Sequence, residues 1–208
     1  MKLRIIGGTL RGRIICLSGV AEEFRPTMDR MREAVASSLQ KTIPDALVAD
    51  VCAGSGAFGF EMLSRGAARV DFVEDNRLRA EAIRARAREF GVEDRCRIVC
   101  QSVQTFVRHP QPLYDIIYYD PPYESGELYS YVKDLYKMLR PHATLLVERG
   151  RRDIQTDPAQ PRPHDRRWRA NAAHQTFDLR VFAAFPDEDD QQQRNHDGQR
   201  NRHQAGQP

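Results

Sequence analysis

The sequence has few cysteines, and their spacing excludes the common metal and redox motifs. They are Cys16, Cys52, Cys96 and Cys100, and no two are separated by the two-residue gap of a zinc knuckle or a thioredoxin-type site. Cys96 and Cys100 fall on or beside a predicted strand, where four residues span about 13 Å, too far to share one metal ion. We therefore expect reduced thiols in a cytoplasmic protein, and no metal site.

The chain also lacks an apolar run that could span a membrane, a secretory signal at its start, and a strong overall charge. Its formal net charge is only +3 over 208 residues. However, residues 1–33 carry seven basic against four acidic side chains, and residues 149–169 carry seven Arg against three Asp. Two basic zones in one domain predict a phosphate-rich partner, although a solvated surface is the better explanation of any single Arg.

From residue 46 onward, strand and helix patterns alternate. Asn76 can cap one of the helices, and Gly91 can end it. Repeated strand–helix units of this length predict an α/β fold with a parallel sheet. The pattern predicts strands at residues 46–52, 69–74, 97–100, 115–120 and 143–148, helices at residues 57–65, 77–90 and 129–139, and a last, edge strand at residues 177–185.

The composition divides the chain into three parts. Residues 1–42 form an N-terminal extension, in which a β-hairpin at residues 3–17 precedes a helix with Thr27 as its expected N-cap. Residues 43–186 form the main domain. Residues 187–208 contain almost nothing apolar, so we expect a disordered tail.

A glycine-rich loop follows the first predicted strand of the main domain. Gly54-x-Gly56-x-x-Gly59 matches the nucleotide-binding fingerprint between a strand and a helix. Glu74 follows Gly54 by 20 positions, at the end of the next strand. A carboxylate at that place can bind both ribose hydroxyls, so the motif predicts a cofactor that contains adenosine.

Asp50 indicates which cofactor this is. It stands at the strand end just before the loop, where a carboxylate would repel a pyrophosphate. The same carboxylate suits a cationic amino-acid moiety, which favours S-adenosylmethionine. Asp50 could instead simply accept hydrogen bonds from loop amides.

A second corner follows the strand at residues 115–120. It reads Asp120-Pro121-Pro122-Tyr123, and its prolines end the strand because they cannot donate to a sheet ladder. The Asp120 carboxylate and the Pro121 carbonyl could accept hydrogen bonds from an amino group on a nucleobase, and Tyr123 could stack on the base. The alternative is a turn that merely ends the strand.

Together these residues resemble the bacterial small-subunit ribosomal RNA guanine-N2 methyltransferase family. The resemblance covers roughly residues 3–148, and the N-terminal arginine pattern is its most specific part. The motifs that carry it are Arg4-Ile5-Ile6-Gly7-Gly8, Arg11-Gly12-Arg13, Arg25-Pro26-Thr27, Asp29-Arg30, Arg32-Glu33-Ala34, Ala53-Gly54-Ser55-Gly56, Leu63-Ser64-Arg65-Gly66-Ala67 and Asp120-Pro121-Pro122-Tyr123.

The resemblance implies a Rossmann-like, seven-stranded class I methyltransferase fold whose N-terminal extension docks RNA. It implies S-adenosylmethionine as the methyl donor. The acceptor would be the 2-amino group of a guanine in ribosomal RNA, within the small subunit or its assembly intermediate. We expect a monomer.

The resemblance also assigns residues to roles. Where the family usually has an Asp after the third strand, this sequence has Ser102, a weaker acceptor for the adenine amine. We therefore expect adenine recognition either to be looser or to be shared with Gln101. Arg30 and Arg32 lie off the apolar stripe of their helix and are expected to face a partner. The expected site residues are Asp120, Pro121, Pro122 and Tyr123 for catalysis, Asp50, Ala53, Gly54, Ser55, Gly56, Glu74, Asp75, Gln101 and Ser102 for the cofactor, and Arg4, Arg11, Arg13, Arg25, Arg30 and Arg32 for RNA.

Three other functions fit parts of the pattern. A DNA adenine or cytosine amino-methyltransferase could use the same Asp-Pro-Pro-Tyr corner, but this chain has little spare length for reading DNA. A nicotinamide oxidoreductase would use the glycine loop and leave that corner unexplained. A non-enzymatic RNA-binding assembly protein would leave both motifs without a role.

Overall fold

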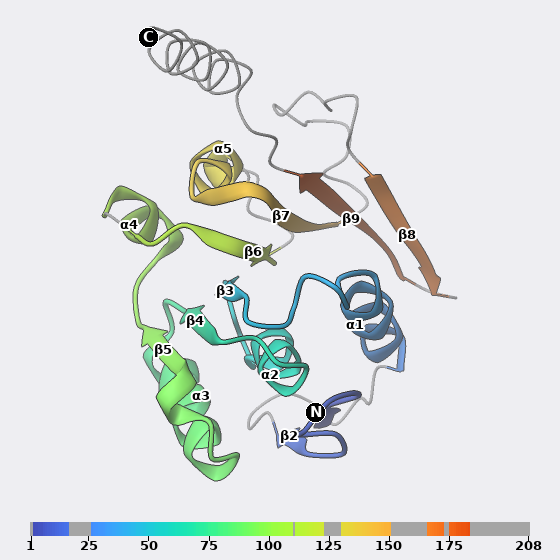
Figure 1. Ribbon diagram of the computed structural model, residues 1–208, viewed down its shortest axis with the longest axis vertical. Helices are drawn as coiled ribbons and strands as arrows, with labels where there is room; N and C mark the ends of the chain where they lie inside the picture. The colour runs from blue at the N-terminus through green and yellow to red at the C-terminus, as the bar shows by residue number, and fades with distance from the viewer. Residues whose placement is uncertain are drawn as a thin grey trace, which may run out of the picture.

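The computed structural model describes residues 2–16, 26–109, 111–122, 130–150, 166–172 and 175–183. A seven-stranded sheet in the order β5-β4-β3-β6-β7-β9-β8 forms its centre (Figure 1). Strands β3 to β7 run parallel, and β9 is antiparallel to both β7 and β8. The strands are β3 (Leu47–Val51), β4 (Arg69–Val73), β5 (Cys96–Val99), β6 (Tyr114–Tyr119), β7 (Leu139–Gly150), β8 (Arg166–Ala172) and β9 (Gln175–Ala183).

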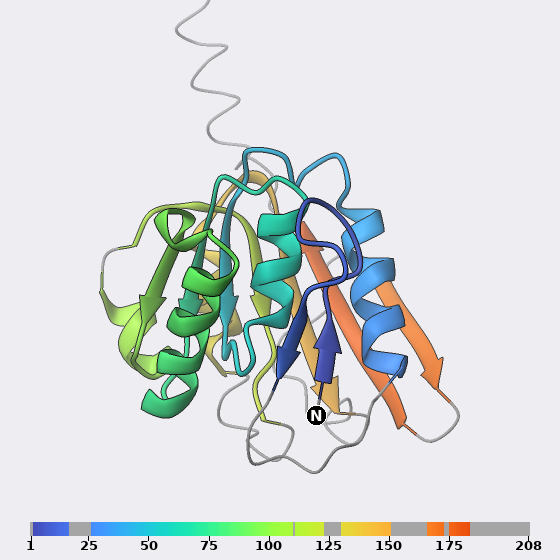
Figure 2. The ribbon, with the colours of Figure 1, turned by 90° about the horizontal axis from the view of Figure 1, so that it is seen from below.

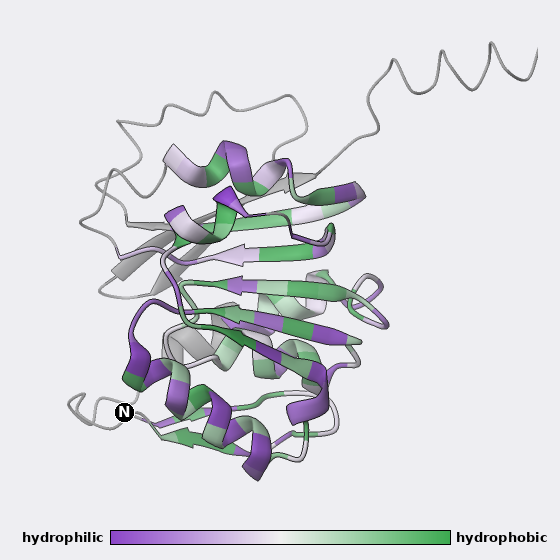
Figure 3. Ribbon diagram, turned by 90° about the vertical axis from the view of Figure 1, so that its left-hand side faces the viewer, coloured by the Kyte–Doolittle hydropathy of each residue, from purple (hydrophilic) through white to green (hydrophobic). Residues whose placement is uncertain are grey.

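Helices cover both faces of this sheet, because its central strands are apolar on both sides (Figure 3). Helices α1, α2 and α3 lie with the N-terminal hairpin on one face (Figure 2), and α4 and α5 pack on the other. Alternate residues of β6 separate accordingly: Ile116 and Tyr118 join the first core cluster, and Ile117 and Tyr119 join the second. The helices are α1 (Pro26–Ser38), α2 (Ala57–Ser64), α3 (Arg77–Glu89), α4 (Val103–Arg108) and α5 (Val132–Tyr136), with a 3₁₀ turn at Glu93–Arg95.

The N-terminal hairpin is joined to the main domain through α2. Its strands, β1 (Lys2–Arg4) and β2 (Ile14–Cys16), pair antiparallel, as the sequence predicts. The buried Glu61 carboxylate accepts hydrogen bonds from the amides of Ile6, at 2.8 Å, and Gly7, at 2.9 Å. Leu3 and Ile15 join the same core cluster as α2, so the packing continues across residue 42.

The α3 prediction is confirmed in detail. The Asn76 side chain accepts a hydrogen bond from the Arg79 amide at 3.1 Å and caps the helix. Gly91 follows the helix with φ +66°, the left-handed conformation of a C-terminal stop.

Two helix predictions are wrong at their boundaries. Helix α1 begins at Pro26, so Thr27 lies inside the first turn and is not the N-cap. Proline suits that first position because its φ is already helical and its missing N–H would have had no helical partner. Helix α5 ends at Tyr136 and β7 begins at Leu139, both earlier than predicted.

The last strand is also not at the edge. Strand β9 lies between β7 and β8, and the Arg-rich β8, which the sequence pattern did not indicate, forms the edge. Charged residues are a common means of protecting an edge strand from unwanted pairing. No helix in the described part of the chain is long and apolar enough to cross a membrane.

Candidate active site

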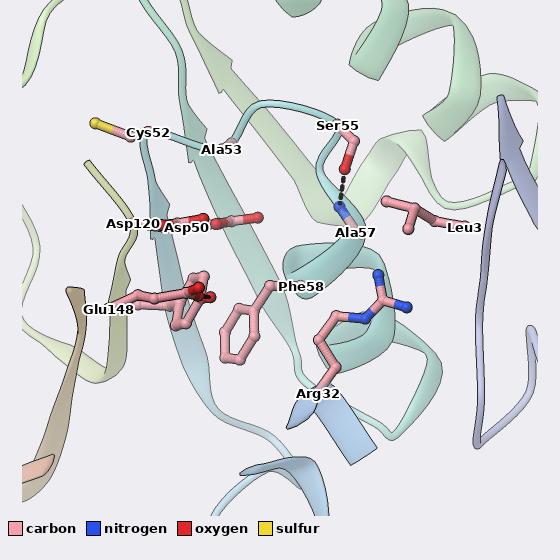
Figure 4. A pocket seen from close by; sticks show the side chains of 11 residues that line it. Leu3, Arg32, Asp50, Cys52, Ala53, Ser55, Ala57, Phe58, Asp120 and Glu148 are labelled. Atoms are coloured by element: carbon pink, nitrogen blue, oxygen red, sulfur yellow. Dashed lines mark hydrogen bonds between the residues drawn. The ribbon is translucent and has the colours of Figure 1, made fainter. Parts of the chain in front are cut away.

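The two predicted motif corners meet at the carboxyl edge of the sheet. Strands β3 and β6 are parallel neighbours with Val51 level with Tyr119, and the Asp120 amide donates to the Val51 carbonyl at 3.2 Å. The glycine loop and the Asp-Pro-Pro corner therefore begin side by side. A pocket at this place (Figure 4) is lined by Leu3, Arg32, Asp50, Cys52, Ala53, Ser55, Ala57, Phe58, Tyr118, Asp120 and Glu148.

The glycines of the loop serve two different purposes. A Cβ atom on Gly59 would lie 2.3 Å from the Phe72 ring, and one on Gly56 would lie 3.0 Å from the Phe60 ring, so both allow helix α2 to pack closely. A Cβ atom on Gly54 would meet nothing nearer than the Cys52 carbonyl at 3.9 Å. Gly54 has φ +55°, so it provides the turn and leaves space on its open side, as close approach of a ligand requires.

Glu74 holds the loop in this shape. One oxygen of its buried carboxylate accepts from the Gly54 amide at 2.7 Å, and the other accepts from the Asn76 amide at 3.0 Å. A carboxylate offers about four lone-pair sites, so two remain for the predicted ribose hydroxyls. Asp75, the next residue, is exposed.

Asp50 accepts a hydrogen bond from a backbone amide, which is the alternative that the sequence left open, and it also lines the pocket. Its carboxylate accepts from the Gly59 amide, in the first turn of α2, at 2.9 Å. Burial raises the pKa of Asp50 from 3.8 to about 7, although the Gly59 N–H and the Arg32 charge oppose the rise and Glu74 adds to it. The site can therefore hold Asp50 either neutral or charged near neutral pH.

Asp120 lies in the pocket together with two other acids. Burial raises the pKa of Asp120 well above its usual value, and the charges of Glu148 and Asp50 raise it further. A cation placed among these carboxylates would reverse that rise. Pro121 is buried beside Asp120 and Pro122 is exposed, whereas Tyr123 lies outside the described residues, so its stacking role stays a prediction.

Glu148 and Tyr118 belong to the site and were not predicted to. The Tyr118 hydroxyl donates to the buried Glu148 carboxylate, and the Tyr118 ring stacks on Phe58 with centroids 4.1 Å apart. Figure 4 shows Asp50, Asp120 and Glu148 on one side of Phe58 and Arg32 on the other. A signal was present, because Glu148 ends the apolar run of the strand predicted at residues 143–148, just as Asp120 ends the run at residues 115–120.

Cys52 lines the pocket without being a plausible nucleophile. Burial raises the pKa of its thiol to about 12, and the charges of Glu74, Asp120, Asp75 and Asp50 contribute to the rise. The thiol is therefore protonated at neutral pH. The four cysteines are free, and the described residues contain no group of three or more His, Cys, Asp or Glu side chains that could hold a metal ion.

Ser102 and Gln101 lie after β5, outside the residues that line this pocket. The Ser102 hydroxyl accepts from the Thr105 amide at 3.2 Å, so Ser102 is the N-cap of α4. The sequence analysis did not predict this helix. Its signals were Ser102 as a possible N-cap and the apolar spacing of Val103 and Phe106.

The predicted RNA-binding arginines separate into two groups. Arg4, Arg11 and Arg13 are exposed on the hairpin. Arg32 is buried and its guanidinium donates to the Arg4 carbonyl at 3.2 Å, so it is not exposed as its place off the apolar stripe suggested; because it lines the pocket, its contact with RNA stays a prediction. Helical spacing identified the apolar stripe of α1 but not what covers its other side. Arg25 and the side chain of Arg30 lie outside the described residues.

Comparison with known proteins identifies the family. The model of the family described as conserved hypothetical protein 95 matches residues 3–177. Ribosomal RNA small subunit methyltransferase D of Haemophilus influenzae is 32% identical over 152 residues, which are 71% of this chain and 78% of that protein. The chain belongs to the ribosomal RNA small subunit methyltransferase D family.

Solved structures support the fold. The Escherichia coli protein yhhF covers 89% of this chain and 99% of its own, with 25% identity and a TM-score of 0.72. An O-methyltransferase from Bacillus cereus in complex with SAH covers 78% of this chain and 83% of its own, with 14% identity and a TM-score of 0.59. The predicted Rossmann-like class I methyltransferase fold is thus confirmed.

Proposed function

We propose that this protein transfers a methyl group from S-adenosylmethionine to the exocyclic 2-amino group of a guanine in small-subunit ribosomal RNA. One observation carries the proposal. The glycine loop after β3 and the Asp-Pro-Pro corner after β6 begin on adjacent strands and border one pocket. A methyl donor held by the first motif and a base amine held by the second would therefore meet.

The chemistry of the pocket fits the methyl donor. S-adenosylmethionine supplies an electrophilic methyl group on a positively charged sulfonium, and its amino-acid part carries an ammonium. Asp50 and Asp120 offer negative charge at the pocket, and Glu74 offers acceptors beside the glycine loop. The open side of Gly54 leaves room for a nucleoside against the backbone.

Asp120 and Pro121 would prepare the acceptor. The lone pair of a guanine 2-amino group is delocalised into the ring, so the amine is a weak nucleophile. Acceptors at the Asp120 carboxylate and the Pro121 carbonyl would favour a pyramidal nitrogen and stabilise the positive charge that develops on it. As the N–C bond forms and the methyl S–C bond breaks, the positive charge passes from the sulfonium to the nitrogen and S-adenosylhomocysteine leaves as a neutral thioether. The nitrogen then releases a proton, for which the Asp120 carboxylate is the nearby base.

A guanine that is stacked in the RNA would have to leave its stack for its 2-amino group to enter the pocket. Arg4, Arg11 and Arg13 on the hairpin would bind phosphates of the surrounding RNA, which makes binding dependent on salt. The names of the relatives support ribosomal RNA of the small subunit as the substrate. The choice of guanine follows from the resemblance of the motifs.

A methyl-transfer assay tests the proposal. Small subunits isolated from a strain that lacks the enzyme are incubated with the protein and tritiated S-adenosylmethionine, and the modified nucleotide is identified by mass spectrometry. We expect one methyl group per subunit, recovered as N2-methylguanosine. Label on another base, or no transfer to either assembled subunits or free ribosomal RNA, would contradict the proposal.

A further inference from the structure

Strand β7 places an acid beside Asp120 that no motif had indicated. Strands β6 and β7 are parallel, with Tyr118 level with Leu146 and Tyr119 level with Val147. Asp120 follows directly after β6, and Glu148 is the next residue on β7. The two acids are therefore neighbours across strands that lie about 4.8 Å apart. Both line the pocket.

Glu148 is held in one orientation. Its carboxylate is buried and accepts a hydrogen bond from the Tyr118 hydroxyl. The Tyr118 ring is itself fixed by stacking on Phe58, at an interplanar angle of 14°. A carboxylate has about four lone-pair sites, so Glu148 can accept from a base as well as from the Tyr118 hydroxyl and its other neighbours.

Guanine differs from the other amino bases in the atom beside its amine. A ring nitrogen next to the 2-amino group, N1, carries a hydrogen. In adenine and in cytosine, the ring nitrogen next to the amine is an acceptor with a lone pair. Two carboxylates side by side therefore match two neighbouring N–H groups of guanine, whereas adenine or cytosine would direct a lone pair at one of the carboxylates.

We infer that Glu148 selects guanine by accepting a hydrogen bond from its N1–H while Asp120 and Pro121 accept from the 2-amino group. This inference rests on the proposed function, and it adds the reason why that site takes guanine. Tyr118 is the positioning residue that directs Glu148 at the base. A buried acceptor that loses its donor is costly, so such a site rejects the wrong base strongly.

The test removes the hydrogen on N1 of the base. Small subunits are reconstituted with 2-aminopurine in place of the mapped target guanine; 2-aminopurine retains the 2-amino group but has neither the hydrogen on N1 nor the O6 oxygen, and the Glu148 variant below separates these two losses. We expect the wild-type protein to methylate 2-aminopurine at least about 100-fold more slowly than guanine, measured as kcat/KM. Equal rates on the two bases would overturn the inference and leave the proposed function intact. If guanine itself is not methylated, the proposed function fails first.

The variant Glu148→Gln sharpens the result. A Gln side chain of the same shape can donate to the N1 lone pair of 2-aminopurine. We therefore expect the ratio of kcat/KM for guanine to kcat/KM for 2-aminopurine to fall by about tenfold or more, because kcat/KM falls for guanine and rises for 2-aminopurine. A merely structural role would slow both substrates equally, which would overturn the inference. Tyr118→Phe, which removes the hydroxyl that holds Glu148, should narrow the preference less, and Glu93→Gln, at an exposed position, should leave it unchanged. The comparison of guanine with 2-aminopurine as substrates of the wild-type protein stands even if a variant does not fold.

Discussion

The two sides of the pocket hold their carboxylates in different ways. On the β3–β4 side, Asp50 and Glu74 accept hydrogen bonds from backbone amides and fix the glycine loop. On the β6–β7 side, the Asp120 carboxylate has no hydrogen-bond donor among the described residues, and the Glu148 carboxylate is bound by a side chain, the Tyr118 hydroxyl. On the first side, both carboxylates accept hydrogen bonds before a ligand binds. On the second side, a bound cation would balance the charge of Asp120 and a base amine would donate hydrogen bonds to it.

Asp120 lies on that second side, where its desolvation raises its pKa and the charges of Glu148 and Asp50 raise it further. We regard the β6–β7 side as the acceptor side and the β3–β4 side as the donor side. The predictions below test that division, in order of decreasing effect.

Replacing the acid on the acceptor side should produce the largest effect. Asp120→Asn keeps the shape but removes the charge that stabilises the developing positive nitrogen, so we expect kcat to fall by about 10²–10³-fold. Binding of S-adenosylhomocysteine, measured by calorimetry, should change by less than about threefold, because the donor side is intact. The matched control Asp94→Asn, at an exposed position, should retain full activity. If Asp120→Asn turns over normally, the role given to Asp120 is wrong.

Replacing the acid on the donor side should show the opposite pattern. In Glu74→Gln one of the two amides that Glu74 binds, Gly54 or Asn76, would face an NH₂ group in place of an oxygen. We expect affinity for S-adenosylmethionine to fall by about 10–100-fold, with a smaller loss of kcat at saturating donor. Glu81→Gln, on the exposed face of α3, is the control. A variant that lost kcat but bound the donor normally would break the division between the two sides.

The charge of the donor should be visible in the pH dependence of binding. The pKa values of Asp50 and Asp120 are raised in the unliganded protein, so both acids hold protons at a pH where a free carboxyl would not. A bound sulfonium favours the charged carboxylates, so binding releases protons, and affinity should rise with pH below about 7. The expected slope approaches about tenfold per pH unit for each proton released.

S-adenosylhomocysteine provides the control for this experiment because it lacks the sulfonium charge. Its affinity should depend on pH more weakly than that of S-adenosylmethionine between pH 5 and pH 8 (roughly the range set by the raised pKa values). In Asp50→Asn the slope for S-adenosylmethionine should become shallower. Parallel pH profiles for the two ligands in the wild-type protein would show that the acids do not sense the methyl donor.

The sequence predicted the donor side well because that side is built from local signals. The glycine loop, Glu74 at a spacing of 20 residues and the Asn76 cap all depend on neighbours in the chain. The Asp120 corner was predictable for a related reason, since a parallel sheet brings the carboxyl ends of its strands to one edge.

The acceptor side was less predictable because it depends on contacts between distant segments. Glu148 gains its role only from the order of the sheet, which places β7 beside β6. The burial of Arg32 depends on the hairpin and on Arg4, which lie outside its own helix. The position of β9 depends on its pairing with β8, whose Arg-rich sequence has few features of a strand.

The smallest predicted effect lies on the exposed surface of the N-terminal hairpin. Arg11 is exposed on the hairpin loop, so Arg11→Ala should remove about one phosphate contact and weaken RNA binding only a few-fold near physiological salt. The dependence of log affinity on log salt should become shallower by about one unit. Arg88→Ala, exposed on α3, is the matched control and should change neither value. Because both variants lose one positive charge, equal effects would indicate nonspecific attraction, and only a larger effect at Arg11 would assign the hairpin to the RNA.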